Sequence, residues 1–457
     1  MNPALAKNPN VALSKSGVKP FVVKPVKELH GQIHLPGDKS IAHRAIILSA
    51  LVYGKTRIDN FPPNDDCLET ISVFRKLGIK ITKGNNIFVF GKGLTGFNKP
   101  KGPIFINESG TTLRLLLGVL SGQNFKTQIK AGKVLSRRPM ARVTRPLRSM
   151  GALIRGKAGK WESGQMEEYP PIMVKGGVLK GITYELPVAS AQVKSALLLA
   201  GLFAKEETKV IEPVKTRDHT ERMLAVFKAA IKVKGNTITI NGSRKLSSPG
   251  SIYVPGDISS AAFFLVAASF LPNSRIILKN VGLNPSRVGI IKVLKRMKAN
   301  IKIRNYRSNG EPVADIEVKG SRLYATRIAK NEIPSLIDEL PVLMVASSLA
   351  KGRTVIEGAQ ELRVKETDRI NSMIENLVKM GAKITSSRKD VQENIAIEGV
   401  GCLQGANLKS YGDHRTAMSM IVAGIAAKGN SKIDDISCIS KSFPGFIKSL
   451  NALKSKI

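Results

Sequence analysis

The sequence predicts an α/β protein of two similar domains, each built from three copies of one small unit. Six segments share one pattern: a polar or glycine-bearing turn, an apolar helix-like run, a second turn and a β-branched run. They begin near Leu35, Asn107, Leu186, Val254, Ile333 and Tyr411. The intervals of 72, 79, 68, 79 and 78 residues exceed a hairpin or a helix pair and fit a repeated α/β unit. A chain of 457 residues is too long for one ordinary core, so three units per domain is the natural division.

Each element of the unit has its own signal. The β-branched run after the apolar helix predicts strands at 56–58, 127–129, 209–211, 275–278 and 354–356. Between the copies, helices are expected at 66–77, 143–150, 220–228, 290–297 and 368–380. Three of these helices stop at a glycine that can act as a C-cap: Gly78, Gly151 and Gly381. Alternating runs such as IKITKGNNIFVF predict hairpins, so the unit is helix, strand, helix, hairpin, with the sheet on one side and the helices inside.

The composition is that of a globular protein with a strong attraction for anions. Hydrophobic residues make up 42% and charged residues 23%, and no apolar run reaches the roughly 18 residues of a membrane span. The net charge of +38 suits nucleic acid or a phosphorylated metabolite, or else reflects a solvated basic surface. Aromatic residues are only 5% and are not interleaved with basic runs, so a stacking platform for single strands is not indicated.

The cysteines and the N-terminal residues bear on the cellular setting. Cys67, Cys402 and Cys438 are far apart and odd in number, which gives neither a disulfide framework nor a metal-ligand spacing. This usage favours a reducing, cytoplasmic setting. Residues 1–20 lack acidic side chains and also lack the apolar core of a signal peptide, so we expect a flexible tail there.

The segment PGDKSIAHR places three polar candidates at one helix start. Lys39 and Arg44 supply two cations and Ser40 supplies a hydroxyl beside the unpaired backbone N–H groups of the first turn. Such a group would clamp a carboxylate or a phosphate. The alternative is an ordinary helix cap, made by Asp38 or Ser40, with both cations in solvent.

Three further motifs carry candidates of the same kind. NESGTTLR contains Gly110, where a ligand could approach the backbone closely. SRRPMARV contributes Arg138, and VASAQVKS presents Ser190, Gln192 and Lys194 before an apolar helix. Taken singly, these segments are equally an ordinary turn, a solvated charged face and an N-cap.

The last third of the chain adds charges of both signs. In ELRVKETDR, the alternation of Lys365, Glu366 and Arg369 fits either surface pairing or a proton donor beside an anion site. Arg415 in GDHRTAM and Lys441 in KSFPGF add further cations.

An acid occupies an unusual place in the fifth copy. In IDELP, Asp338 stands where the other copies have Gly, Ser or Lys. A carboxylate in a cleft lined for anions is costly unless it has a task. Acid/base chemistry is such a task.

Together these motifs resemble the EPSP (5-enolpyruvylshikimate-3-phosphate) synthase family, from about Val22 to the C-terminus, with eight motifs in the family's order. The resemblance implies an inside-out α/β barrel fold, in which two domains of three βαβαββ units enclose an active-site cleft. It implies a discontinuous domain of residues 21–37 plus 256–457 and a second domain of residues 38–255. The chain would then cross between the domains near Pro36 and near Gly256.

The implied reaction moves the enolpyruvyl group of phosphoenolpyruvate to the 5-hydroxyl of shikimate-3-phosphate. It proceeds by addition and elimination through a tetrahedral intermediate, with loss of phosphate. The resemblance implies no metal and no cofactor, and we expect a monomer whose partners are the two small substrates, with no specific nucleic acid and no membrane.

The resemblance also assigns roles to residues. It implies catalysis by Lys39, Asp338 and Glu366. It implies binding of shikimate-3-phosphate by Lys39, Ser40, Arg44, Ser190, Gln192, Thr216, Asp338 and Lys365. It implies binding of phosphoenolpyruvate, and of the inhibitor glyphosate in the same pocket, by Lys39, Gly110, Arg138, Gln192, Arg369, Arg415 and Lys441. The substrates together bring about six negative charges, which agrees with a site rich in cations.

Three positions depart from common family residues. Glu108 stands where the family usually has Asn, Ala191 replaces a serine of some members, and Glu361 replaces an asparagine of some members.

Two other functions are weighed against this one. The UDP-N-acetylglucosamine enolpyruvyl transferases share the fold and the second substrate, but they typically use a loop cysteine. SRRPMARV has none, and that family has Lys-Asn where this chain has Lys39 and Ser40. A nucleic-acid-binding protein is suggested by charge alone and does not explain Asp338 and Glu366 among the cations.

Overall fold

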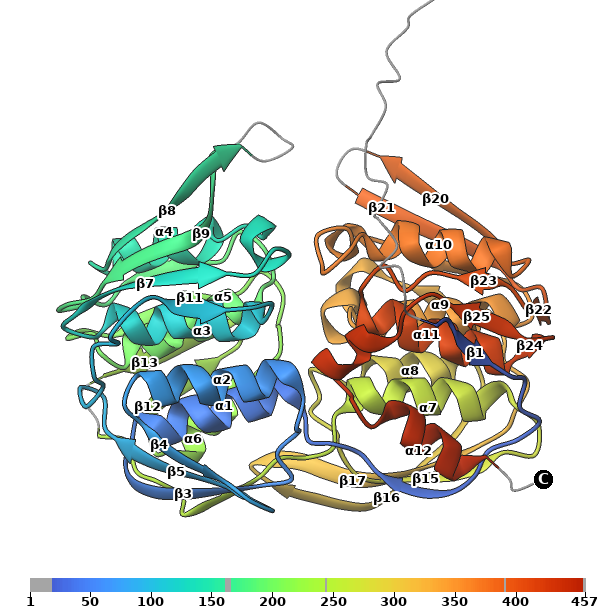
Figure 1. The fold of residues 1–457 in the computed structure, drawn as a ribbon, viewed down its shortest axis with the longest axis horizontal. Coiled ribbons are helices and arrows are strands. Elements are labelled where there is room, and N and C mark those ends of the chain that lie inside the picture. Colours follow the sequence, from blue (N-terminus) through green and yellow to red (C-terminus); the bar gives the residue numbers. More distant parts are fainter. Residues whose placement is uncertain (1–18, 161–165, 243–244, 390–391, 455–457) are drawn as a thin grey trace, which may run out of the picture.

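The computed structural model describes residues 19–160, 166–242, 245–389 and 392–454, and it shows two bodies side by side (Figure 1). Each body has its own hydrophobic core. The core of the inserted body is formed by residues between Ile41 and Val254. The core of the discontinuous body combines residues between Val23 and Leu35 with residues between Ile258 and Leu453. The predicted tail, 1–20, lies outside the described residues except for Lys19 and Pro20.

The inserted body contains three units of the same plan. In chain order its helices are α1 (Lys39–Ala50), α2 (Asp65–Lys76), α3 (Gly110–Ser121), α4 (Ala141–Ser149), α5 (Ala191–Gly201) and α6 (His219–Val226). Its strands are β3 (Tyr53–Asp59), β4 (Lys80–Lys83), β5 (Ile87–Lys92), β6 (Ile104–Ile106), β7 (Lys126–Ala131), β8 (Leu153–Lys160), β9 (Met166–Lys175), β10 (Thr183–Glu185), β11 (Thr208–Ile211), β12 (Ala230–Lys234), β13 (Thr237–Asn241) and β14 (Ser251–Tyr253). They form three four-stranded sheets in the orders β14-β3-β5-β4, β6-β7-β9-β8 and β10-β11-β13-β12.

The discontinuous body repeats the plan with one shorter unit. Its helices are α7 (Ile258–Phe270), α8 (Gly289–Arg296), α9 (Leu340–Leu349), α10 (Arg369–Lys379), α11 (His414–Ile425) and α12 (Phe446–Leu453). Its strands are β1 (Phe21–Val23), β2 (His30–His34), β15 (Arg275–Gly282), β16 (Asn300–Asn309), β17 (Glu311–Lys319), β18 (Arg327–Ile328), β19 (Arg353–Ile356), β20 (Lys383–Lys389), β21 (Gln392–Glu398), β22 (Leu403–Gln404), β23 (Asn407–Leu408), β24 (Ala427–Lys428) and β25 (Ser431–Ile433). Two sheets have four strands, β16-β17-β15-β2 and β18-β19-β21-β20, whereas the last copy has the three-stranded sheet β1-β25-β23 and the pair β22-β24.

All six units begin with a parallel strand pair, and the four-stranded sheets continue with an antiparallel hairpin. The strands and helices predicted from the sequence are all present, with bounds shifted by a few residues at most. The sixth copy departs from the full unit, because β25 is followed by α12 and not by an antiparallel hairpin.

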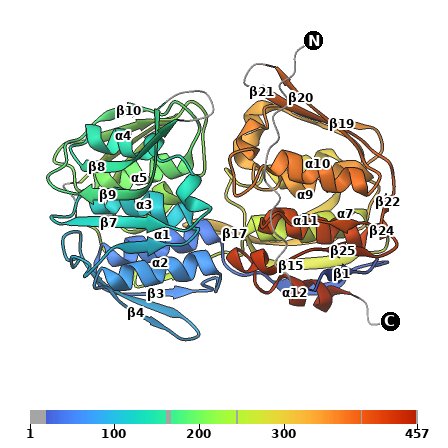
Figure 2. The same cartoon turned by 45° about the horizontal axis from the view of Figure 1, so that its top comes forward.

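The inner helices are buried because their apolar residues surround the whole helix. In α7, every residue from Ile258 to Ser269 is buried, and a helix that is apolar all round belongs in a core. The outer helices α8 and α10 keep one polar face. In Figure 2 strands lie around α7, α9, α10 and α11 of the discontinuous body, which agrees with the predicted arrangement of helices inside and sheets outside, whereas α12 lies at the outer edge.

The chain crosses between the bodies at two matching PGD segments. Gly37 and Gly256 form an antiparallel bridge, and Asp38 N donates to Pro255 O at 2.7 Å. Asp38 and Asp257 then cap α1 and α7, and Arg287 contacts both carboxylates, at 2.9 and 3.3 Å. We propose this crossing as the domain boundary, since the residues between the two connections form one core and the residues outside them form the other.

Candidate active site

A cavity of about 980 Å³ lies between the two bodies. Its wall includes the first or capping residues of the inner helices α1, α3, α5, α7 and α11, and also Ile337 and Asp338 just before α9. Unpaired N–H groups and the helix dipole make each such start attractive to anions. Of the predicted site residues, those that line the cavity are Lys39, Ser40, Arg44, Gly110, Arg138, Ser190, Gln192, Thr216, Asp338, Lys365, Glu366, Arg369 and Arg415. Lys441 is not part of this lining.

The start of α1 is both a helix cap and a cation site. Asp38 accepts from Ile41 N, as the capping alternative requires. The cations nevertheless do not lie in solvent, because Arg44 is only 3% exposed. Lys39 Nζ lies 2.9 Å from Asp66 Oδ2. Burial lowers the pKa of Lys39, but the nearby carboxylates of Asp66 and Glu366 more than offset burial and raise that pKa overall. Lys39 is therefore a charged ammonium at the wall.

The guanidinium of Arg44 is held on three sides. Its nitrogens donate to Thr220 Oγ1 at 2.6 Å, Ser40 O at 2.8 Å and Ser195 Oγ at 2.7 Å. Burial lowers the pKa of Arg44 to about 10, so the group remains charged at neutral pH. These contacts fix the direction in which Arg44 faces the cavity.

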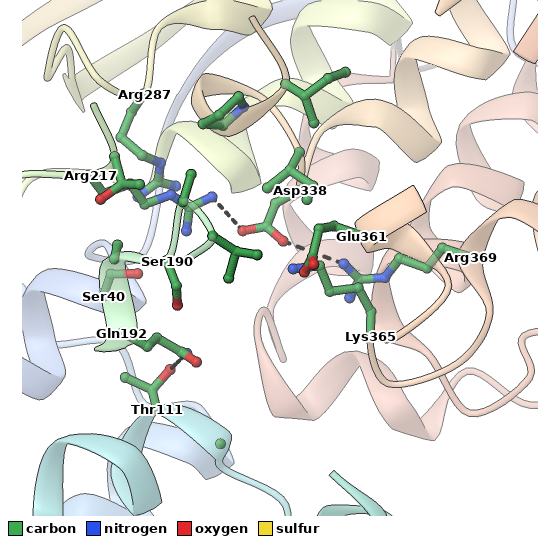
Figure 3. A pocket seen from close by; sticks show the side chains of 18 of the residues that line it. Ser40, Thr111, Ser190, Gln192, Arg217, Arg287, Asp338, Glu361, Lys365 and Arg369 are labelled. Carbon is green, nitrogen blue, oxygen red and sulfur yellow. Dashed lines mark hydrogen bonds and ion pairs between the residues drawn. The ribbon is translucent and has the colours of Figure 1, made fainter. Parts of the chain in front are cut away.

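Gln192, which lines the cavity, is held in place by two neighbouring side chains. Its Nε2 donates to Thr111 Oγ1 at 2.9 Å (Figure 3). Arg114 donates to its Oε1. Ser190, the N-cap of α5, accepts from Val193 N at 3.4 Å. Ser190 is therefore an N-cap, as the alternative requires, and it also lines the cavity together with the fixed amide of Gln192.

Gly110 allows Arg138 to lie against the start of α3. A Cβ atom at Gly110 would be only 2.6 Å from Arg138 Nη1. Arg138 Nη1 in turn lies 3.9 Å from Glu366 Oε1, across the cleft. A side chain at this position would therefore have to displace the guanidinium of Arg138.

Asp338 is surrounded by cations from both bodies. Its Oδ2 is 2.5 Å from Arg217 Nη2, and its Oδ1 is 3.4 Å from Arg369 Nη1 and 3.7 Å from Arg415 Nε (Figure 3). Burial acts to raise the pKa of Asp338, but these arginines and Lys365 hold it well below its ordinary value. Asp338 is therefore an ionised carboxylate in the ligand-free cleft.

Glu366 is a second ionised carboxylate that is held among cations. Its Oε2 is 2.5 Å from Arg369 Nη2. Burial acts to raise its pKa, and the charges of Arg369, Arg138 and other neighbours hold it well below its ordinary value. Lys365 beside it has a pKa lowered to about 8, chiefly by burial.

Two residues with prominent positions at the site were missed or differ in role. Arg217 faces Asp338 from the opposite body, yet sequence reasoning selected only its neighbour Thr216. The sequence signal that could have identified Arg217 is the charge-rich segment KTRDHTE, in which it stands. Lys441 does not line the cavity itself but pairs with a residue that does, since its Nζ is 2.6 Å from Glu108 Oε2; it also donates to Gly412 O at 3.2 Å.

The other two departures from family residues, Ala191 and Glu361, line the cavity. Glu361 Oε2 is 3.9 Å from Arg142 Nη1, so it faces a cation of the inserted body. Glu108, Glu361 and Asp338 thus all make charge contacts across the cleft.

A cation-rich cleft between two bodies of repeated units, with ionised carboxylates in its wall, suits an enzyme that acts on anionic substrates. The fold is shared with the enolpyruvyl transferase NikO from Streptomyces tendae, at 16% identity and a TM-score of 0.72 over 95% of this chain and 97% of that chain. The EPSP synthase of Acinetobacter baumannii is more similar, at 41% identity and a TM-score of 0.84 over 96% of this chain and 98% of that one.

The sequence comparisons give the family. The family model of EPSP synthase (3-phosphoshikimate 1-carboxyvinyltransferase) matches residues 23–450. A 3-phosphoshikimate 1-carboxyvinyltransferase from Desulforamulus reducens is 47% identical over 93% of this chain and 97% of its own length. Another, from Bacillus cytotoxicus, is 46% identical over 94% of this chain and 99% of its own length. The chain belongs to the EPSP synthase family, which confirms the resemblance predicted from its motifs.

Proposed function

We propose that this cleft transfers the enolpyruvyl group of phosphoenolpyruvate to the 5-hydroxyl of shikimate-3-phosphate. The products are 5-enolpyruvylshikimate-3-phosphate and inorganic phosphate, and the reaction belongs to the shikimate pathway. The observation that carries the proposal is the pair Asp338 and Glu366, two ionised carboxylates held among cations in the cavity between the bodies. Such a pair gives proton transfer beside two bound anions.

The residues divide between the two substrates. Shikimate-3-phosphate is bound by Lys39, Ser40, Arg44, Ser190, Gln192, Thr216, Asp338 and Lys365. Phosphoenolpyruvate is bound by Lys39, Gly110, Arg138, Gln192, Arg369, Arg415 and Lys441. The catalytic residues are Lys39, Asp338 and Glu366. The cavity lining supports all of these roles except that of Lys441, which has to exchange Glu108 for the ligand.

The proposed steps balance in protons. In the addition, the 5-hydroxyl oxygen attacks C2 of phosphoenolpyruvate, Asp338 takes the hydroxyl proton, and an acid at Glu366 delivers a proton to C3. In the elimination, Glu366 takes a proton back from the new methyl group while the C2–O bond to phosphate breaks, and the proton held by Asp338 leaves with the phosphate as HPO4²⁻. The arginines stabilise the negative charge of the leaving phosphate.

The charges explain how a carboxylate with a low pKa can become an acid. In the free cleft, Glu366 is held ionised chiefly by Arg369 and Arg138. Substrates that bring about six negative charges neutralise those cations and raise the pKa of any neighbouring carboxylate. Binding therefore prepares Glu366 to carry a proton.

Two finer statements belong to the same proposal. We expect the enzyme to act as a monomer in the cytoplasm, which is consistent with three cysteines that are unpaired in the described structure. Within the described residues, no helix combines the length and apolar character needed to cross a membrane.

The test is a phosphate-release assay with purified protein, shikimate-3-phosphate and phosphoenolpyruvate. Release should require both substrates, and the new product should carry the enolpyruvyl group at the 5-oxygen by NMR. UDP-N-acetylglucosamine in place of shikimate-3-phosphate should give no release. Release with that nucleotide sugar, or none with shikimate-3-phosphate, would contradict the proposal.

A further inference from the structure

A buried lysine lies behind the cavity wall of the inserted body. Lys194 is on α5, four residues after the N-cap Ser190, but its side chain is fully buried. Its Nζ is 2.9 Å from Glu212 Oε2 and 2.6 Å from Glu221 Oε1, and both carboxylates are buried as well. The cost of removing charges from water can exceed the gain from their mutual attraction. Three buried charges are therefore weak evidence of a role in stability alone.

The second oxygen of Glu212 reaches the cavity wall. Glu212 follows β11 directly and opens the loop 213–217, in which Thr216 and Arg217 line the cavity. Its Oε1 accepts the backbone N–H of Thr216 at 3.1 Å and also the Thr216 hydroxyl. One carboxylate therefore connects the Lys194 ammonium to the loop.

This contact determines what Thr216 can offer a ligand. A threonine hydroxyl carries a single proton, and Thr216 donates both that proton and its N–H to Glu212. Only oxygen lone pairs are left for the cavity side. A phosphate dianion also presents acceptors, so the two would repel each other. In this arrangement Thr216 is an anchor of the loop and not a donor to phosphate.

The anchored loop controls the direction of its next residue. Arg217 extends from the loop into the cleft, where its Nη2 lies 2.5 Å from Asp338 Oδ2 (Figure 3). A loop with a free Thr216 would leave this long side chain without a fixed base.

We propose that Lys194 and Glu212 are positioning residues for the acceptor substrate: they hold the loop 213–217 through Thr216 and so fix the phosphate-facing wall of the shikimate-3-phosphate site. This inference rests on the proposed function and changes the role of Thr216 from ligand to anchor. Glu221 is a second counter-charge to Lys194, with which it makes an ion pair, and its charge also acts on the guanidinium of Arg44.

The decisive variant is Glu212→Gln. A glutamine has one acceptor oxygen, whereas Glu212 uses one oxygen toward Lys194 and the other toward Thr216. The substitution keeps the volume and breaks the connection, and Lys194 keeps Glu221 as its partner. We expect the KM for shikimate-3-phosphate to rise about 10-fold, because bonds to a charged group are lost, while kcat and the KM for phosphoenolpyruvate change less than about threefold.

The matched control is Glu221→Gln, which makes the same change in the same buried cluster without touching the loop. Its KM for shikimate-3-phosphate should stay within about twofold of the unaltered enzyme. Both variants are assayed at a temperature at which circular dichroism shows them folded. Equal KM values for the two variants, whether raised or unchanged, would mean that the cluster is merely structural, and would overturn the proposal.

A double-mutant cycle separates an anchor from a ligand. Thr216→Val should raise the same KM about as much as Glu212→Gln, and the double variant should show no further rise, because both remove one connection. If the two effects multiply, Thr216 contacts the phosphate independently of Glu212 and the anchor role is wrong. Turnover by the unaltered enzyme is measured first, so that failure of the proposed function is recognised separately.

Discussion

Replacement of Gly110 by alanine tests how closely the phosphoenolpyruvate side of the cleft is built. A Cβ atom there would lie 2.6 Å from Nη1 and 3.2 Å from Cζ of Arg138, whereas ordinary contact begins at 3.4 Å. The guanidinium tip has to retreat by 3.4 − 2.6 = 0.8 Å to reach ordinary contact. Sequence reasoning expected the methyl group to enter the ligand space directly. The structure indicates that it acts by displacing Arg138.

The displacement sets the size of the expected effect. A misplacement of about 1 Å at a reacting site costs up to about 100-fold in rate. Because the obstructed atom ends a flexible side chain, we expect a smaller loss, with the KM for phosphoenolpyruvate raised about 10-fold. Glyphosate, which the family binds in this pocket, is longer and has less room to shift, so its inhibition constant should rise more.

The assay compares the inhibition constant of glyphosate with the KM of phosphoenolpyruvate in both proteins. Gly102→Ala is the control, since a Cβ atom there meets nothing within 4 Å. The unaltered enzyme should be inhibited by glyphosate. Equal weakening of both ligands, an enzyme that is insensitive from the start, or an unchanged KM in Gly110→Ala would refute the reasoning.

Further predictions concern the charged groups and the two bodies. Asp338→Ala and Glu366→Ala should each lower kcat by about 10²- to 10⁴-fold with a smaller effect on substrate binding by calorimetry, and lost binding with normal turnover would contradict their acid/base role. Lys39→Met should impair binding of both substrates, and near-normal kinetics would exclude Lys39 from the site. Since the ammonium of Lys365, with a pKa of about 8, is charged below that pH, kcat/KM for shikimate-3-phosphate should fall as pH rises through 8, and Lys365→Arg should remove this decline. Saturating shikimate-3-phosphate should decrease the radius of gyration in small-angle scattering, and no decrease would count against closure of the cleft.

The fold could be predicted because its signals are local and repeated. Apolar runs around the whole of helices such as α7 identify the buried helices, and β-branched runs after them identify the first sheet strands. The shortened sixth unit could not be predicted in this way. Its sheet is completed by β1, which lies hundreds of residues earlier in the sequence and pairs with β25.

The candidate site was predictable where its residues cluster at helix starts. Lys39, Gly110 and Gln192 each stand near the beginning of an inner helix, and those starts converge on one cavity. Charge pairs between the bodies were not predictable. The importance of Arg217 depends on Asp338, 121 residues further along the chain. Likewise, no local pattern reveals that Lys194 turns away from the cavity.

Lys441 is a second residue whose contacts could not be predicted from the sequence. Its sequence motif predicts a ligand contact, yet the nearest anion in the structure is Glu108 of the other body. Glu108 is itself a departure from the residue common in the family, so a family motif alone gives no reason to expect this pair.

The crossing of the chain at Gly37 and Gly256 has a mechanical consequence. The two connections are bonded to each other and form a hinge. A single connection would allow the bodies to twist freely, whereas a bonded pair resists twisting. Arg287 stabilises this hinge, because it forms ion pairs with both Asp38 and Asp257. A side chain at Gly37 could not be accommodated, since a Cβ atom would be 2.1 Å from Asn60 O. We therefore expect the cleft to open and close mainly by rotation about this hinge, with the largest displacement at the far rim of the cleft.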